Sequence, residues 1–252
     1  MELFWIISGL TVLGILGFEL QILAVRSSVR SKAQPASEQD FGTFCPPISI
    51  LKPLSGLDDG LFDNLMSFCQ QEYPKFEILL SLPNSNDPAY RVAQKIKDKF
   101  PDREISLIVE EGNEGWNPKA NNLLPAFRKA RYPYLLISDR NVRVEKDYLG
   151  KTVQPMRDLE IGLVTNLIRG IGGRTMGSLF ENLHLNSFVI GNVCLLQRYL
   201  NISCVIGKSM LMRKEDLEAI GGSRQSKMFW QRTTSLAKKS RNEGRESLFP
   251  VI

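Results

Sequence analysis

Short apolar runs alternate with helical patterns from Pro46 to Gly222, and this alternation most constrains the fold. Parallel strands need a crossover connection, usually a helix, whereas antiparallel strands can be joined by a tight turn. The order strand–helix–strand therefore predicts an α/β fold, a mostly parallel sheet with helices on both faces. The predicted strands are 48–54, 76–82, 105–109, 134–138 and 161–167. The predicted helices are 59–71, 87–100, 118–130 and 178–200, followed by an extended segment 204–213 and a short helix that ends at Gly221 and Gly222.

An apolar run at residues 3–25 precedes this pattern, with Glu19 and Gln21 as its strongly polar interruptions. A helix of this length, at ~1.5 Å per residue, can cross a hydrocarbon core of ~30 Å. A secretory signal peptide is the alternative, but it needs basic residues before the run and a small-residue cleavage site after it. The sequence has neither, so we expect residues 1–26 to be a transmembrane anchor.

Basic residues directly follow this apolar run and predict its orientation. Arg26, Arg30 and Lys32 lie just after the span, and basic residues favour the cytoplasmic side. We expect a single-pass membrane protein with its N-terminus outside and its globular domain, residues 46–222, in the cytoplasm. The polar segment 27–45 between them shows no sustained pattern and is predicted to be a linker.

Charge and motifs exclude several other classes of protein. The formal net charge is +5, and residues 223–252 carry all of it, so nucleic-acid binding by the body is not expected. This polar, basic segment is predicted to be a disordered tail. The four cysteines lack CxxC spacing and His184 lies far from them in sequence, so no metal–thiolate site is expected. Neither a dinucleotide-binding GxGxxG after the first strand nor a phosphate-binding GxxxxGK[ST] is present.

Polar residues follow four successive predicted strands, where ligands of parallel sheets bind. Each has a structural explanation: Asp87 as a helix cap, Asp139 as a turn residue, and Lys119 on a solvated helix face. Their occurrence at four strand ends favours a shared crevice. A carboxylate there could hold a divalent cation against the diphosphate of a nucleotide-sugar. The candidates are Lys52, Asp87, Asn117, Lys119, Asn121, Asn122, Asp139 and Arg140.

Three segments carry a resemblance to a known family: "ISILKPLSGLDDGLFDNLMSFCQQEYPKFEILLSLPNSNDPA", "GWNPKANNLLPAFRKARYPYLLISDRNVRV" and "CVIGKSMLMRKEDLEAIGG". In order and spacing they resemble the ceramide glucosyltransferase family, including its bacterial, hopanoid-associated members. The resemblance runs from about residue 47 to 222. It implies an inverting glycosyltransferase of the GT-A fold that transfers a sugar, glucose foremost, from a UDP-sugar to a lipid hydroxyl.

The resemblance also implies roles for individual residues. Asp87 of "NDP" matches the family's first aspartate, at the nucleoside, and Asp139 of "SDRNVRV" matches its second, which helps hold Mg²⁺ or Mn²⁺ and the diphosphate. Asn117 and Lys119 match the "NPK" segment beside the nucleotide, and Lys52 completes the expected donor-binding set. The implied partners are a UDP-sugar, membrane lipids and a lipid acceptor, for which ceramide, a diacylglycerol-type lipid and a hopanoid-linked lipid all fit.

The match ends at Gly222. The family carries a third aspartate shortly afterwards, as the base that deprotonates the acceptor, and then a Q-x-x-R-W segment. Residues 223–252 contain no aspartate and no Q-x-x-R-W, so we identify no catalytic base and expect little activity from this chain alone. The change at Ser223 suggests a truncated or frame-shifted relative. Two alternatives are a catalytically inactive UDP-sugar-binding module, with or without a partner subunit that supplies the base, and a membrane-surface scaffold whose basic tail binds anionic lipid.

Overall fold

The computed structural model describes residues 1–32, 44–58, 60–110, 118–173, 175–200, 202 and 204–219. These residues fall into two compact units. The larger unit contains the described residues of 44–166 and 205–219, and the smaller one those of 1–32 and 167–204.

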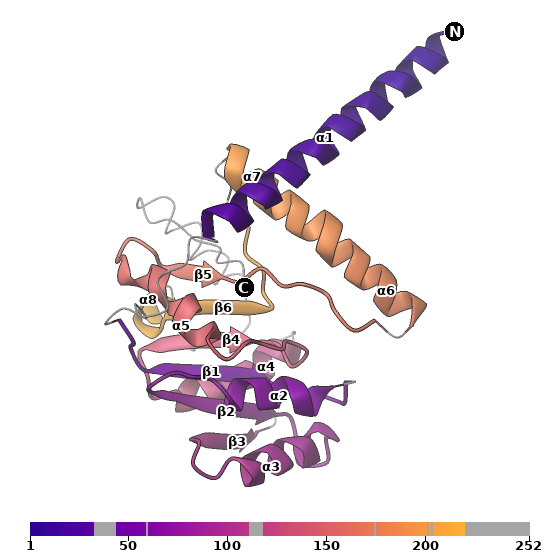
Figure 1. Ribbon diagram of the computed structural model, residues 1–252. Coiled ribbons are helices and arrows are strands. Elements are labelled where there is room, and N and C mark those ends of the chain that lie inside the picture. The colour runs from indigo at the N-terminus through magenta and orange to yellow at the C-terminus, as the bar shows by residue number, and fades with distance from the viewer. Residues whose placement is uncertain are drawn as a thin grey trace. The chain divides into compact units, whose positions relative to one another are not determined.

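The described residues of the larger unit form a six-stranded sheet (Figure 1). Its strands are β1 (Ile48–Pro53), β2 (Phe76–Leu82), β3 (Ile105–Val109), β4 (Tyr134–Ser138), β5 (Leu163–Thr165) and β6 (Ser209–Arg213). Their order in space is β3-β2-β1-β4-β6-β5, and β1 pairs in parallel with both β2 and β4, as β2 does with β3. The strand β6 runs antiparallel to both of its neighbours, β4 and β5. The predicted mostly parallel sheet is therefore confirmed.

Helices cover both faces of this sheet (Figure 1). On one face, Leu123 and Phe127 of the helix α4 (Pro118–Lys129) pack in a buried cluster with Leu51 of β1 and Leu135 of β4. On the other face, the ring of Phe68 lies under Lys52 of β1. Every residue of β1 and β2 is buried as a result. The helices of this unit are α2 (Leu61–Cys69), α3 (Ala89–Lys99), α4 (Pro118–Lys129), α5 (Tyr148–Val153), the 3₁₀ helix η1 (Gln154–Arg157) and α8 (Lys214–Ala219).

The smaller unit begins with one long helix, α1 (Glu2–Lys32). The helical segment 2–28 is long and apolar enough to cross a membrane. Its most apolar part is not buried, which suggests membrane anchoring. The helix continues to Lys32, so 27–32 are helical, although the sequence pattern predicted a linker there. Neither glycine nor proline interrupts these residues, and their basic side chains have high helix propensity.

A second long helix in this unit consists of α6 (Met176–Leu183), the π-helical turn η2 (His184–Val189) and α7 (Ile190–Leu200). It starts two residues before the predicted 178, because Thr175 and Ser178 form a capping box at its N-terminus. Its 25 residues also reach the length and hydropathy of a membrane-spanning helix, although it is less apolar than α1. This property was not predicted from the sequence.

Candidate functional site

The strand order places the candidate crevice between β1 and β4. The chain runs outward from β1 through β2 to β3 and then returns to the other side of β1 as β4. In open α/β sheets, ligands bind outside the carboxyl ends of the strands at such a reversal. Ser138, the last residue of β4, pairs with Ser209, the first residue of β6. The segment that precedes β6 therefore meets the carboxyl ends of the parallel strands.

Asp139 and Lys119 are in direct contact at this edge. The Asp139 carboxylate forms an ion pair with the Lys119 ammonium, and both side chains are partly exposed. The Asp139 amide donates to the Lys208 carbonyl at 3.0 Å, and Lys119 Nζ donates to the Gly207 carbonyl at 3.2 Å. Lys119 is the second residue of α4, so the end of β4, the start of α4 and the segment before β6 are joined at one point.

Lys52 lies beneath Asp139 and does not reach solvent. Its side chain is fully buried, with Nζ 3.7 Å from the centroid of the Phe68 ring. Nζ donates to the backbone carbonyl of Asp139 at 2.9 Å and lies 3.3 Å from Ser138 Oγ. Lys52 therefore fixes the backbone that carries the Asp139 carboxylate. Burial lowers the pKa of Lys52 to about 7, although the Asp139 charge partly opposes this shift.

We expect Lys52→Met to flatten the rise of stability with pH. The unfolded lysine titrates near 10.5 and the folded one near 7, so the unfolded chain binds the extra proton between these values. The resulting cost to folding is complete below pH ~7 and is relieved as the pH rises toward 10.5. Urea unfolding should show the wild type gaining about 2 kcal/mol relative to Lys52→Met between pH 7 and pH 9.

Lys97→Met is the matched control, because Lys97 is exposed on α3. This variant should keep the wild-type dependence of unfolding free energy on pH. Parallel curves for wild type and Lys52→Met would show that Lys52 stays charged in the folded protein.

Asp87 holds the loop after β1 against the start of α3. Its carboxylate accepts from the Gly56 amide at 2.9 and 3.0 Å and from the Ala89 amide at 2.8 Å. Gly56 has φ +68, where a side chain would strain the backbone. The helix α3 has Pro88 as its N-cap, so Asp87 is not the predicted cap residue, although its carboxylate accepts from the first helical amide. The contact with the Gly56 loop was not predicted.

Arg140 ties the loop after β4 to the same loop after β1. Its guanidinium makes two hydrogen bonds to the Asp58 carboxylate, Nε to Oδ2 at 2.6 Å and Nη2 to Oδ1 at 3.0 Å. Asn122, buried on α4, donates to the Leu54 carbonyl at 3.1 Å. Arg140 and Asn122 were predicted from the sequence. Asp58 was not, because in the sequence it is simply one of two adjacent aspartates in a loop. Asn117 lies outside the described residues.

A buried polar network supports the start of β6. The hydroxyls of Tyr148 and Ser209 are hydrogen-bonded, and Asn166 Nδ2 donates to them at 3.0 and 2.9 Å. Burial raises the pKa of Tyr148 to about 12, so its hydroxyl stays protonated. The network holds Ser209 in place. The preceding residue is Lys208, whose backbone carbonyl accepts a hydrogen bond from the Asp139 amide. This network could not be predicted from the sequence, because its residues lie far apart in the chain.

The charged side chains at this edge of the sheet suit a divalent cation that binds together with a diphosphate. Among the described residues, no group of three or more His, Cys, Asp or Glu side chains could hold a metal ion. Mg²⁺ is commonly held by one or two carboxylates together with substrate phosphates. Asp139, partly exposed beside a lysine, could provide such a carboxylate, and Lys119 could provide a further positive charge for phosphate oxygens.

The fold is the GT-A fold of nucleotide-sugar-dependent glycosyltransferases. The mannosyltransferase PcManGT of Pyrobaculum calidifontis, solved with GDP-mannose and Mn²⁺, superimposes with a TM-score of 0.63 at 20% identity. The alignment covers 96% of this chain and 65% of PcManGT. The glucosyl-3-phosphoglycerate synthase of Mycobacterium tuberculosis, solved with UDP and Mn²⁺, gives a TM-score of 0.50 at 12% identity over 82% of this chain and 71% of that one.

The chain belongs to Glycosyl transferase family 21, which residues 9–243 match. It is 32% identical to ceramide glucosyltransferase 1 of Caenorhabditis elegans over 183 residues, which cover 70% of this chain and 38% of that protein. It is also 32% identical to a ceramide glucosyltransferase of Gibberella zeae over 170 residues, covering 62% of this chain and 32% of that protein. The resemblance to this family is confirmed, but the family match continues past the predicted end at Gly222 to residue 243. The chain spans well under half the length of these relatives.

Proposed function

We propose that this chain provides the donor-binding part of a membrane-anchored lipid glycosyltransferase, in which a sugar passes from a UDP-sugar to a lipid hydroxyl with inversion. The observation that carries the proposal is the ion pair between Lys119 and Asp139, beyond the carboxyl end of β4 where the strand order reverses. Glucose is the expected sugar, because the chain belongs to a family whose curated relatives are ceramide glucosyltransferases.

Each site residue has a proposed task in donor binding. Asp139 would hold Mg²⁺ or Mn²⁺, which when bound supplies positive charge to neutralise the departing diphosphate. Lys119 would leave Asp139 and bind phosphate oxygens, and Lys52 would keep the Asp139 backbone in place. Asp87 would shape the nucleoside pocket by fixing the Gly56 loop. Asn117 is proposed to lie beside the nucleotide, as in the family's "NPK" segment.

The acceptor is proposed to be a membrane lipid with a free hydroxyl, such as ceramide, a diacylglycerol-type lipid or a hopanoid-linked lipid. A lipid acceptor fits a chain whose N-terminal helix suggests membrane anchoring. The basic residues that follow this span favour a cytoplasmic location for the larger unit, with the N-terminus outside.

A donor-binding module without turnover is the second candidate. It is favoured by residues 223–252, which carry no aspartate at the place where the family has its base. The two candidates share the donor site and differ in whether a base removes the acceptor proton.

The test uses the full chain in nanodiscs. Calorimetry should detect UDP-glucose binding that is stronger with Mn²⁺ than with EDTA, and labelled UDP-glucose with ceramide would then report transfer. Binding without glycolipid favours the module. Absence of UDP-glucose binding would contradict both candidates.

We expect Lys119→Ala to weaken UDP binding by ~1–3 kcal/mol, because a hydrogen bond to a charged phosphate oxygen is lost. The measurement is the Kd for UDP in the presence of Mn²⁺. Lys129→Ala, an exposed lysine at the other end of α4, is the control and should bind UDP as the wild type does. Equal affinity in all three proteins would mean that Lys119 only pairs with Asp139.

A further inference from the structure

We infer that the helix from Met176 to Leu200 is a second membrane contact, lying along the bilayer interface with one apolar face in the acyl chains. This inference rests on the proposed anchoring of α1 in a membrane, and it does not depend on the proposed sugar transfer. The residues that support it all lie in the smaller unit.

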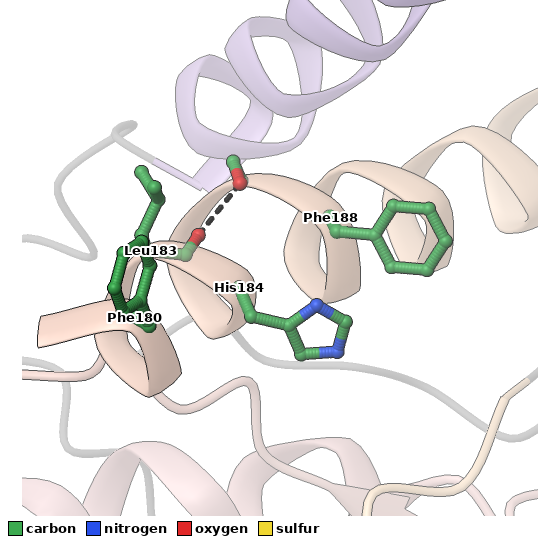
Figure 2. Close-up of a pocket in the computed structure, with 5 residues that line it drawn as sticks. Phe180, Leu183, His184 and Phe188 are labelled. Atoms are coloured by element: carbon green, nitrogen blue, oxygen red, sulfur yellow. Dashed lines mark hydrogen bonds between the residues drawn. The ribbon is translucent and has the colours of Figure 1, made fainter. Parts of the chain in front are cut away.

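Large apolar side chains project from one side of this helix. Met176, Phe180, Leu183 and Phe188 are 68%, 63%, 62% and 59% exposed. Figure 2 shows Phe180, Leu183, His184 and Phe188 around one pocket, which Ser187 also lines. The wider π turn of η2 brings Phe188 to the side that carries Phe180 and Leu183. A contiguous exposed apolar surface of this kind marks a site that binds a membrane, a protein or a ligand.

The polar side of the same helix is already occupied by its own unit. The Asn186 side-chain amide donates to the Gly170 carbonyl and accepts from the Gly170 amide, both at 2.8 Å. Asn182 packs so closely on Gly170 that a Cβ there would clash with it. The polar face therefore covers the segment around Gly170, and the apolar face points away from it. In a helix that packs on a protein core, this arrangement is reversed.

The contact with α1 identifies the bilayer as the partner for the apolar face. Gly191 of α7 is buried against Gln21 of α1, where a Cβ would lie 2.9 Å from Gln21 Oε1. Gln21 Nε2 also donates to Asn192 Oδ1 at 3.0 Å. Gln21 lies shortly before Arg26, the first basic residue after the apolar run of α1. Arg26 marks the interface, because basic residues flank membrane spans, so α7 meets α1 close to the level of the lipid headgroups.

The distribution of polar residues favours an in-plane helix over a spanning one. Asn182, Asn186 and Asn192 recur along the helix, and it is less apolar than α1. A helix with an apolar face and a polar face lies in the interface, with its apolar side buried in the boundary between headgroups and acyl chains.

The test is tryptophan quenching with the full chain in phosphatidylcholine vesicles. Trp116→Phe and Trp230→Phe leave Trp5 as a reporter of α1, and Trp5→Phe then gives a tryptophan-free background. In that background, Phe180→Trp and Phe188→Trp probe the apolar face, and Glu181→Trp, exposed on the same helix but outside the pocket, is the control. Circular dichroism checks that each chain folds.

Phosphatidylcholine brominated near the headgroup should remove most of the fluorescence of the Phe180→Trp and Phe188→Trp chains, whereas aqueous iodide should not. The Glu181→Trp chain should show the reverse. Iodide quenching at positions 180 and 188, together with quenching of Trp5 by brominated lipid, would overturn the inference. The proposal that α1 anchors the chain would still hold. Stronger quenching at position 188 by deeply brominated lipid than by shallow would indicate a spanning helix and also overturn it. Failure of brominated lipid to quench Trp5 would remove the anchor on which the inference rests, while UDP-glucose binding would still test the donor site separately.

Discussion

Asp139→Asn is expected to abolish the dependence of UDP binding on Mn²⁺. The asparagine keeps the size of the side chain and can still accept a hydrogen bond, but it removes the negative charge that the structure places beside Lys119. A cation held by one protein carboxylate and a diphosphate would then have only the diphosphate. The affinity for UDP in Mn²⁺ should fall by ~10–100-fold or more. Loss of a residue that only hydrogen-bonds to a metal ligand typically already lowers metal affinity by ~10–100-fold.

The measurement is the Kd for UDP by calorimetry, in Mn²⁺ and in EDTA, for wild type, Asp139→Asn and Asp102→Asn. Asp102 is exposed in the turn after α3 and is the control for removing one negative charge. In EDTA the Asp139→Asn protein should bind UDP no more weakly than the wild type, because Lys119 no longer has to leave a charged partner. Metal dependence that survives Asp139→Asn would identify Asp139 as a turn residue.

The sheet could be predicted because its parallel part follows from local pattern. Each of β1 to β4 is an apolar run followed by a helix or loop, and the observed bounds of β2, β3 and β4 are the predicted ones. The antiparallel direction of β6 could not be predicted, because it depends on pairing with Tyr134–Ser138, far away in the sequence. The short elements α5 and η1 were missed, because a pattern of so few residues carries no periodic signal.

The part of the candidate site that could be predicted consists of residues that follow the ends of strands. Lys119 and Asp139 each follow a strand end, and the structure brings them into contact. The position of Lys52 was predicted, but its burial was not, because that depends on Phe68 from α2 and on the carbonyl of Asp139 from β4. Such contacts between distant segments leave no pattern in a single sequence.

Arg213→Met is expected to destabilise the larger unit by ~3–5 kcal/mol, the cost of removing one partner from a buried charged group. Arg213, the last residue of β6, is only 6% exposed. Its guanidinium donates to the carbonyls of Ile161, Met156 and Asp158 at 2.8, 3.0 and 3.1 Å, and it lies 3.4 Å from the Asp216 carboxylate. Methionine fills similar space but leaves three carbonyls without this donor and Asp216 without this partner.

The measurement is thermal unfolding in detergent, where a loss of this size should lower the Tm by about 6–20 °C for a domain of 150–250 residues. Arg143→Met, an exposed arginine in the loop after β4, is the control and should change the unfolding free energy by less than ~0.5 kcal/mol. Arg213→Lys keeps the charge, but a single ammonium cannot match the planar fork of the guanidinium, so it should fall between wild type and Arg213→Met. If Arg213→Met unfolds at the wild-type temperature, the connection between η1 and β5 does not depend on this arginine, and another contact must hold β5 at the edge of the sheet.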